Sequence, residues 1–216
     1  MSRQYSPQSQ NDEGSYFVTN NAQTGVAMTT TVAFDATKPF VIVQNSAPAG
    51  GKKIQLDYLD LITTAAGSAL SGLTLIQAAV AIDDILRYAS AGTNLTPNIV
   101  SPNMSMGPTS IAQVYAGQIV PAAAHAARLL SGLRTIRPTV SATVADVVGE
   151  LKHFVFGGGW MAPNGSIVVA NPNIIPVPMP PVIIGPQQSA LIYLFYAAGG
   201  TPVAASYAPE LGWSEK

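Results

Sequence analysis

The residues that could carry acid–base or metal chemistry are few and scattered along the chain. His125 lies in an alanine-rich run and His153 in an apolar run, and neither has the HExxH spacing or a second ligand four positions away. The sequence contains no cysteine, which excludes disulfides, thiolate metal sites and a cysteine nucleophile. We therefore expect both histidines to be structural.

The acidic residues do not form a clear ligand set either. Asp57 and Asp60 are three positions apart, so on a regular strand they face opposite sides and share a cation only if a bulge intervenes. Asp83 and Asp84 lie at the end of an expected strand, and with Arg87 they suggest a local ion pair or a calcium site at a subunit junction. A solvated turn is the favoured interpretation, and we predict no metal site.

Motifs of nucleotide binding and nucleophilic catalysis are missing. Gly50 and Gly51 precede Lys52, but the first glycine of a P-loop is absent and Lys53 stands where Ser or Thr is required. No GxSxG elbow occurs, and a dispersed Ser-His-Asp triad has no feature in its favour. We predict a protein that is not an enzyme and binds no cofactor.

Charge is scarce. Charged residues make up 10% of the chain, against about a quarter in ordinary globular proteins, and the mean hydropathy is +0.28. No charged residue occurs in the 57 positions from His153 to Pro209 or in the 40 positions from Tyr88 to Ala127. Such a surface is expected to be covered by other protein chains.

Membranes and nucleic acids are less suitable partners than other protein chains. The charge-free blocks are broken every few residues by Pro, Gly, Asn, Gln or Ser, whereas a membrane-spanning helix needs about 20 consecutive apolar residues. The polar start of the chain, from Met1 to Gln23, lacks the apolar segment of a signal peptide. The net charge is −1, and the densest basic group, Arg128, Arg134 and Arg137, is expected to be a solvated edge. We predict neither a membrane nor a nucleic-acid partner.

The pattern of short apolar runs and turn residues predicts an all-β fold. The 19 glycines and 17 prolines suit many turns, and the spacing of the runs indicates one β-sandwich or jelly roll of about 11 strands spanning residues 25–216. The expected strands are Gly25–Phe34, Phe40–Gln44, Lys53–Thr63, Leu73–Asp83, Ile111–Val120, Arg128–Ile136, Glu150–Phe156, Ser166–Ala170, Val182–Gly185, Ser189–Ala197 and Val203–Tyr207.

Three segments allow other interpretations. Pro121–Leu130 has strong helix formers and suitable stop signals, so a short helix near 121–130 is an alternative to strand. Residues 1–24 are rich in Ser, Gln, Asn and Thr, which predicts a flexible polar arm that could order across a neighbouring subunit. The proline-rich run Asn171–Pro186 is expected to be extended, as a crossover between sheets or as a contact arm.

The run Ser189–Ala197 is apolar on both faces. It is either a central strand whose back is covered by a loop, or a strand that packs on another subunit. Tyrosine, phenylalanine and tryptophan are common at protein interfaces. The aromatic residues predicted to form a subunit interface are Tyr193, Phe195, Trp213, Tyr16 and Phe17.

Two segments resemble known proteins. The first, Ala81–Ser105, contains an Arg-Tyr pair at Arg87 and Tyr88 followed by Gly-Thr-x-Leu-Thr-Pro from Gly92 to Pro97; the second, Pro180–Trp213, ends in Glu-Leu-Gly-Trp. They are similar to segments of tailed-bacteriophage virion structural proteins of the capsid decoration or cement type. They cover about a quarter of the chain, and the polar residues before Gly25 have no counterpart in them.

The resemblance implies a β-sandwich protein on the capsid surface, made in the host cytoplasm. It implies binding between subunits of the major capsid protein, a homo-oligomer that is commonly a trimer, and no catalytic residues. Two alternatives stay open. One is another virion component, such as a tail, head-fibre or portal-adjacent protein. The other is a jelly-roll module that binds carbohydrate through Trp160, although an aromatic content of 7% favours protein contacts.

Overall fold

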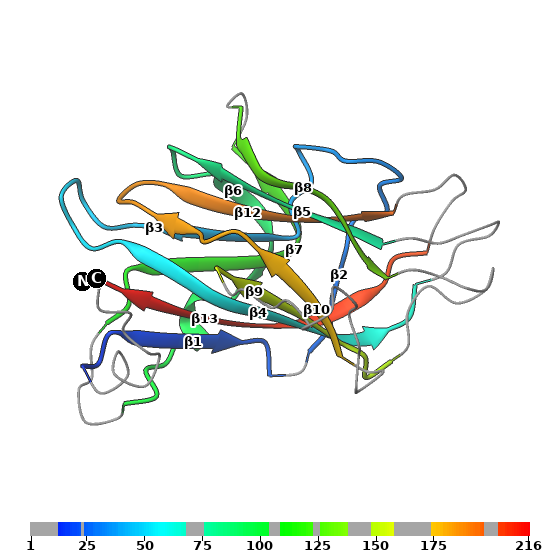
Figure 1. The fold of residues 1–216 in the computed structure, drawn as a ribbon, viewed down its shortest axis with the longest axis horizontal. Helices are drawn as coiled ribbons and strands as arrows, with labels where there is room; N and C mark the ends of the chain where they lie inside the picture. Colours follow the sequence, from blue (N-terminus) through cyan, green and yellow to red (C-terminus); the bar gives the residue numbers. More distant parts are fainter. Residues whose placement is uncertain are drawn as a thin grey trace, which may run out of the picture.

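A computed structural model describes residues 13–22, 24–67, 76–103, 109–122, 126–137, 148–157, 174–196 and 203–216. These residues form two β-sheets (Figure 1). Sheet A contains β1 (Tyr16–Asn20), β2 (Val26–Ala27), β4 (Ile54–Ala65), β9 (Leu151–Phe156), β10 (Ile174–Met179), β11 (Ile183–Ile184) and β13 (Ser206–Glu215). Sheet B contains β3 (Val41–Asn45), β5 (Ile76–Asp83), β6 (Tyr88–Asn94), β7 (Ala112–Pro121), β8 (Arg128–Arg137) and β12 (Ser189–Tyr196). A single turn of 3-10 helix, η1 (Thr96–Asn98), follows β6.

The strand order is that of a jelly roll. Sheet A runs β1-β13-β4-β9-β10 and sheet B runs β6-β7-β3-β12-β5-β8. Within these sheets eight strands pair from the outside inward along the chain: β1 with β13, β3 with β12, β4 with β9, and β5 with β8, all antiparallel. This nested pairing produces two facing sheets from one long folded hairpin. The β6–β7 hairpin extends sheet B, and β10 adds to sheet A in parallel to β9. The predicted all-β sandwich is confirmed.

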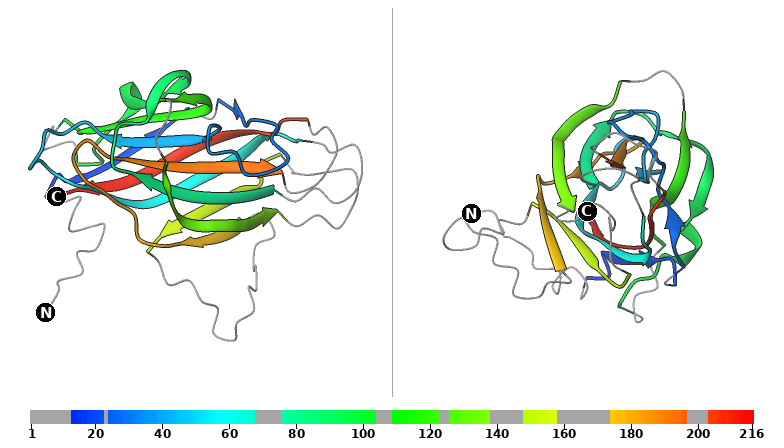
Figure 2. Two further views of the ribbon diagram at one scale, coloured as in Figure 1. Left: turned by 90° about the horizontal axis from the view of Figure 1, so that it is seen from above. Right: turned by 90° about the vertical axis from the view of Figure 1, so that its right-hand side faces the viewer.

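The main core fills the space between the two sheets. Buried and partly exposed residues alternate along the strands of sheet A, most clearly in β9, so one face of the sheet points inward. Phe154 of β9, Leu59 and Leu61 of β4 and Trp213 of β13 are among the buried side chains that share this core with sheet B. Figure 2 (right) looks along the sandwich and shows the strands enclosing this common interior.

Strand β12 is buried on both faces, as its sequence indicates. Ile192 and Leu194 point into the main core, whereas Tyr193 and Phe195 belong to a second apolar cluster on the other face of sheet B. Phe34, in the connection between β2 and β3, covers that cluster, with its ring centroid 5.0 Å from Tyr193 and 5.9 Å from Phe195. Of the two interpretations of this strand, the loop over its back is the one that the fold contains.

The N-terminal segment is not an arm up to residue 24. Tyr16–Asn20 forms β1, which pairs with β13 from Tyr16 opposite Ser214 to Asn20 opposite Glu210. The prediction failed because the polar residues around β1 dilute a short strand whose inward side chain, Phe17, is buried. Residues 1–12 lie outside the described residues.

The proline-rich run contributes the edge strand β10. Its prolines, Pro176 and Pro178, lack the N–H that a central strand must donate, and sheets tolerate proline at an edge. The crossover or contact arm expected for this run is therefore, over Ile174–Met179, a strand of sheet A.

Several other element predictions need correction. The helix alternative near 121–130 is wrong for the residues described, because Pro121 ends β7 and Arg128–Leu130 begin β8. The strand expected at Gly25–Phe34 is reduced to the two residues of β2, and β6 was not anticipated. The expected strand at Ser166–Ala170 lies outside the described residues. No helix in the described part of the chain has the length and apolar character needed to cross a membrane.

Candidate functional site

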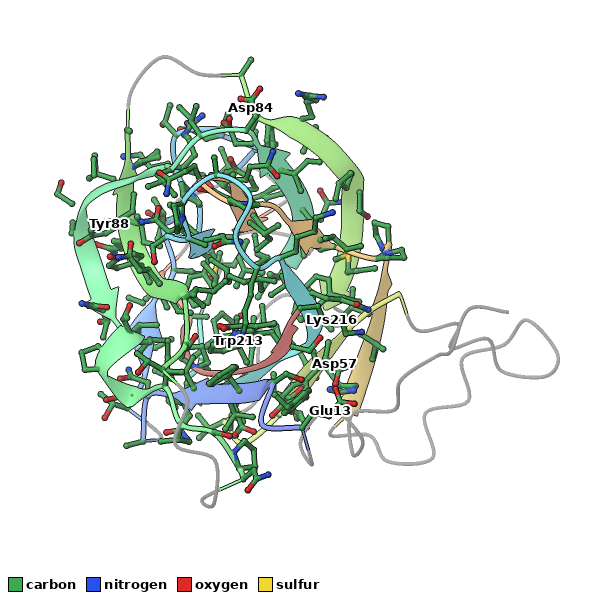
Figure 3. The ribbon with its side chains drawn as sticks, turned by 90° about the vertical axis from the view of Figure 1, so that its left-hand side faces the viewer. Glu13, Asp57, Asp84, Tyr88, Trp213 and Lys216 are labelled. Carbon is green, nitrogen blue, oxygen red and sulfur yellow. The ribbon has the colours of Figure 1, made fainter. Side chains whose placement is uncertain are left out.

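The five aromatic residues predicted to form a subunit interface are all buried within the chain. Trp213 has no exposed surface and stacks on Phe17 at 6.2 Å between ring centroids, deep in the main core. Tyr193 and Phe195 lie under Phe34. Tyr16 is 8% exposed. None of the five presents a surface to a neighbour, so the interface prediction is corrected: intramolecular packing accounts for these aromatics. Figure 3 shows Trp213 inside the ring of strands, with Asp84 and Tyr88 at its periphery.

The main group of side chains with acid–base potential in the described residues is a polar belt on the outer face of sheet A. It crosses four neighbouring strands, β1, β13, β4 and β9. Three pairs make up the belt: Tyr16 donates to Asp57 Oδ2 at 2.8 Å, Tyr58 donates to Glu210 Oε1 at 2.9 Å, and His153 Nδ1 lies 2.5 Å from Asp60 Oδ1.

A β-bulge puts both aspartates of the belt on the same side. Gly212 of β13 pairs with Tyr58 and Trp213 pairs with Leu56, so Asp57 has no partner on β13. The extra residue shifts the alternation of β4, and the buried positions change from Ile54 and Leu56 before the bulge to Leu59 and Leu61 after it. On a regular strand the two aspartates would face opposite sides, and the bulge, which is the exception considered from the sequence, places them on the same side.

Gly212 makes room for the two tyrosines of the belt. A methyl group added at Gly212 would collide with the ring of Tyr58 and would come within 2.6 Å of the Tyr16 hydroxyl. The absence of a side chain therefore lets Tyr16 reach across β13 to Asp57 on β4. This is a close approach that only glycine permits.

Burial is the main influence on the titrating groups of the belt, and the neighbouring charged groups act in addition to it. Burial, and then the hydrogen bond to Asp57, raises the pKa of Tyr16 far above its usual range; burial and the bond to Glu210 do the same for the pKa of Tyr58. Burial also raises the pKa of Asp60, against the opposing effect of His153. The two hydroxyls therefore stay protonated donors at any physiological pH.

The carboxylates of the belt are engaged with partners inside the chain. Each of its three carboxylates already accepts a hydrogen bond or an ion-pair contact from a partner in the belt. Within the described residues, no group of three or more His, Cys, Asp and Glu is placed to hold a metal ion. A shallow depression of about 210 Å³ beside the belt is lined by Glu210 together with uncharged residues such as Asn20, Ile62 and Pro209. The belt ties strands together and makes this face acidic.

Asp83 and Arg87 form a buried ion pair and not a solvated turn. Arg87 Nη1 lies 2.6 Å from Asp83 Oδ2, and both residues are 4% exposed. The backbone N–H of Arg87 donates to Ser189 Oγ on β12, and that hydroxyl donates to the Ile85 carbonyl. The local ion pair considered from the sequence is the arrangement found. Asp84 is exposed and contacts Arg128 at 3.5 Å, so the two aspartates point into different surroundings.

A second buried ionic group lies inside sheet A. Lys152 is fully buried on β9, with Nζ 3.1 Å from Thr63 Oγ1, 3.8 Å from Glu150 Oε2 and 5.0 Å above the Tyr207 ring. The only local signal for this group is the position of Lys152 in phase with Phe154 and Phe156, two apolar residues of the same face. These contacts provide the Lys152 ammonium group with hydrogen-bonding and charged partners inside the chain.

The charge-free stretch after Tyr88 forms one flank of the sandwich. We define the uncharged flank as residues 88–103 with Gln118 and Val120 of the adjoining strand β7. It includes β6, η1 and the segment that reaches across to sheet A, where Val18 and Val100 form a β-bridge. The exposed residues of the flank are Ala89, Ser90, Ala91, Gly92, Asn94, Pro97, Asn98, Val100, Pro102, Gln118 and Val120, with Val100 at 55% and Val120 at 48%.

The flank is held in place by contacts to both sheets. Leu95 is buried, its N–H donates to the Val114 carbonyl, and its own carbonyl accepts a bond from the Thr19 hydroxyl. Asn98 donates to the Asn20 carbonyl at 2.9 Å. At the other end, Tyr88 stacks on Tyr115 with ring centroids 3.5 Å apart. The surface is therefore pre-organised, which lowers the entropy lost on binding a partner.

The flank could be located from the sequence only in part. The charge-free block from Tyr88 to Ala127 is evident in the sequence, but the residues predicted to form an interface are large aromatics elsewhere in the chain, which the fold uses for its core. His125 and Trp160, the other residues considered for binding, lie outside the described residues. No protein-family model, curated protein or solved structure matches this chain.

Proposed function

We propose that this protein is a non-enzymatic virion component of a tailed phage, a decoration or cement protein that binds between subunits of the major capsid protein and stabilises the head. The observation that carries the proposal is the uncharged flank: a rigidly held, exposed surface with no formal charge across 16 consecutive residues, 88–103.

The composition of the flank suits a protein partner. An exposed charge that is buried without a counter-charge costs free energy, so an uncharged surface is easier to desolvate on binding. Its exposed Val100 and Val120 supply apolar area, while Ser90, Asn94 and Asn98 supply hydrogen-bonding groups. Many modest contacts of this kind, repeated by symmetry, are what a protein that reinforces a shell requires.

The edges of the sheets favour side-chain contacts over strand addition. The outer strand β6 carries two register irregularities and the positive φ angles of Ala91 (61°) and Gly92 (70°), which twist it away from regular pairing. At the edge of sheet A, Pro176 and Pro178 remove donors from β10. These features limit uncontrolled edge-to-edge aggregation, which matters for a protein present in many copies.

The test is binding to capsids of the encoding phage that lack this protein. We expect the wild-type chain to co-sediment with them to a fixed stoichiometry, and Val100→Asp in the flank to weaken binding at least tenfold. Val203→Asp is the matched control, because Val203 is also 55% exposed but lies outside the flank. It should bind like the wild type.

Two outcomes would contradict the proposal. If the chain does not bind these capsids at micromolar concentration but is found in purified tails, it is another virion component. If Val100→Asp and Val203→Asp weaken binding equally, the flank is not the contact surface.

A further inference from the structure

A depression of about 320 Å³ lies beside the uncharged flank, and it is larger than the one of about 210 Å³ beside the belt. Its deepest residues include Phe17 of β1 and Ala112 of β7, which are 1% and 2% exposed. The other residues that matter here all carry a hydroxyl group: Thr96 and Ser101 of the flank, and Thr109 and Ser110 just before β7. We call this depression the hydroxyl-lined pocket.

Both sides of the hydroxyl-lined pocket are fixed by hydrogen bonds. On the β7 side, Glu215 Oε1 accepts bonds from Ser110 Oγ at 2.5 Å and from the Ile111 N–H at 3.1 Å, which ties this segment to the end of β13. On the flank side, Thr96 Oγ1 accepts a bond from the Val114 N–H at 3.0 Å. The pocket is therefore pre-organised, and little ordering of its own residues is required when a group enters it.

The pocket offers no charge to an incoming group. The described residues that line it are uncharged, and Lys53 and Lys216, at the adjoining ends of β4 and β13, are not among them. The Glu215 carboxylate behind Ser110 is 2% exposed and also accepts a bond from Trp213 Nε1 at 3.1 Å. A charged occupant would lose its hydration without gaining a counter-charge, which costs free energy. The pocket is therefore suited to an uncharged group.

We infer that the hydroxyl-lined pocket receives a tyrosine side chain of the partner protein, which is the major capsid protein under the proposed function, on which this inference rests. The side chains that contribute most at protein interfaces are Trp, Tyr and Arg, and Arg would lack a counter-charge here. The Thr96 oxygen already accepts a bond, but its own hydrogen can still donate. A phenol hydroxyl can accept that bond, whereas an indole N–H only donates.

The size of the pocket agrees with a single side chain. Pockets for small molecules have volumes of about 300–1,000 Å³, so this one is at the lower end of that range. The apolar surface of Phe17 and Ala112 is suited to the tyrosine ring, and the surrounding hydroxyls are suited to its polar end. The inference deepens the proposed function by naming the point on the molecule at which the partner is anchored.

Two variants that fill the pocket test the inference on capsids that lack this protein. Ser101→Phe fills it from the flank side and Thr109→Phe from the β7 side, so misfolding of one variant leaves the other for the test. The matched control is Ser90→Phe, which adds the same ring to an exposed position of the flank outside the pocket. Circular dichroism verifies that each protein is folded. We expect both pocket variants to weaken capsid binding at least tenfold, and Ser90→Phe to weaken it clearly less.

A titration without capsids tests the pocket by itself. N-acetyltyrosinamide at millimolar concentration should shift the amide NMR signals of Thr109, Ser110 and Ile111 of the wild type until they saturate. N-acetylargininamide should not, and Ser101→Phe should abolish the response to the tyrosine compound.

The outcomes separate this inference from the proposed function. Filled variants that bind capsids like the wild type, or a loss with Ser90→Phe as large as with Ser101→Phe, would overturn the inference and leave the proposed function intact. The absence of saturable shifts with the tyrosine compound would overturn it as well. Saturable shifts together with a wild type that does not bind capsids would support the pocket and contradict the proposed function.

Discussion

Asp57 and Asp60 project from the same outer face of β4 although three positions separate them. The β-bulge at Asp57, opposite the Gly212–Trp213 step of β13, produces this arrangement. Tyr16 and His153 then contact Asp57 and Asp60 from β1 and β9, and the belt joins the N-terminal strand to the centre of the sheet. One irregular position thus decides both how β1 is attached and where the acidic face of the molecule lies.

Gly212→Ala should disrupt this attachment. The added methyl group collides with Tyr58 and crowds the Tyr16 hydroxyl, and overpacking of this kind costs about 1–3 kcal/mol. Urea unfolding measures the loss. In a Tyr58→Ala background the space is open, so the same glycine substitution should cost clearly less. Equal costs in the two backgrounds would show that the tyrosine does not occupy this space.

Asp60→Asn should change how stability depends on pH. Burial raises the pKa of Asp60 in the folded chain, so the fold binds this proton more tightly than the unfolded chain does. The resulting stabilisation is present below the ordinary carboxyl value of 3.8 and is lost as pH rises through the raised value. The asparagine variant lacks that loss, so its stability relative to wild type should improve between pH 3 and pH 7. Urea unfolding at both pH values measures it, and a relative decline would contradict the assignment.

Phe34→Ala should uncover the second apolar cluster. Loss of a partly buried ring that packs on Tyr193 and Phe195 is expected to cost about 2–4 kcal/mol. Burial raises the pKa of Tyr193 to about 12, so exposure should return it toward 10. Spectrophotometric titration of the tyrosines measures that shift. Val32→Ala, in the same connection and 46% exposed, is the control and should change neither quantity appreciably.

Arg87→Met should be among the more destabilising single changes. It leaves the buried Asp83 carboxylate without its guanidinium partner, and breaking such a pair typically costs about 3–5 kcal/mol. The double change Arg87→Met with Asp83→Leu removes both charges and should cost less than Arg87→Met alone. Thermal unfolding of the three proteins distinguishes this result from simple addition of two losses.

The sequence predicted the fold class well, because alternating and apolar runs report directly on burial. It predicted β12 and its two covered faces for the same reason. It missed β1, whose three apolar residues, Tyr16 to Val18, are flanked by polar residues on both sides. It also missed β10, whose prolines argue against a strand unless the strand lies at an edge. Edge position is a property of the whole sheet and leaves no local pattern.

The candidate site was harder to predict for a different reason. Large aromatics are typical both of interfaces and of cores, and Trp213, Tyr193 and Phe195 proved to be core residues. The belt depends on a bulge and on Gly212, which bring together residues from distant parts of the chain. The sequence does show that residues Tyr88 to Ala127 carry no charge. This charge-free block includes the flank on which the proposed function rests.

Comparing capsids with and without the bound protein by electron microscopy tests the proposed function most directly. We predict additional density at symmetry-related positions between major capsid subunits, into which the sandwich fits with Val100 and the rest of the uncharged flank against the shell. Capsids that show no added density after incubation with the protein, or density that contacts the shell through another face, would contradict it.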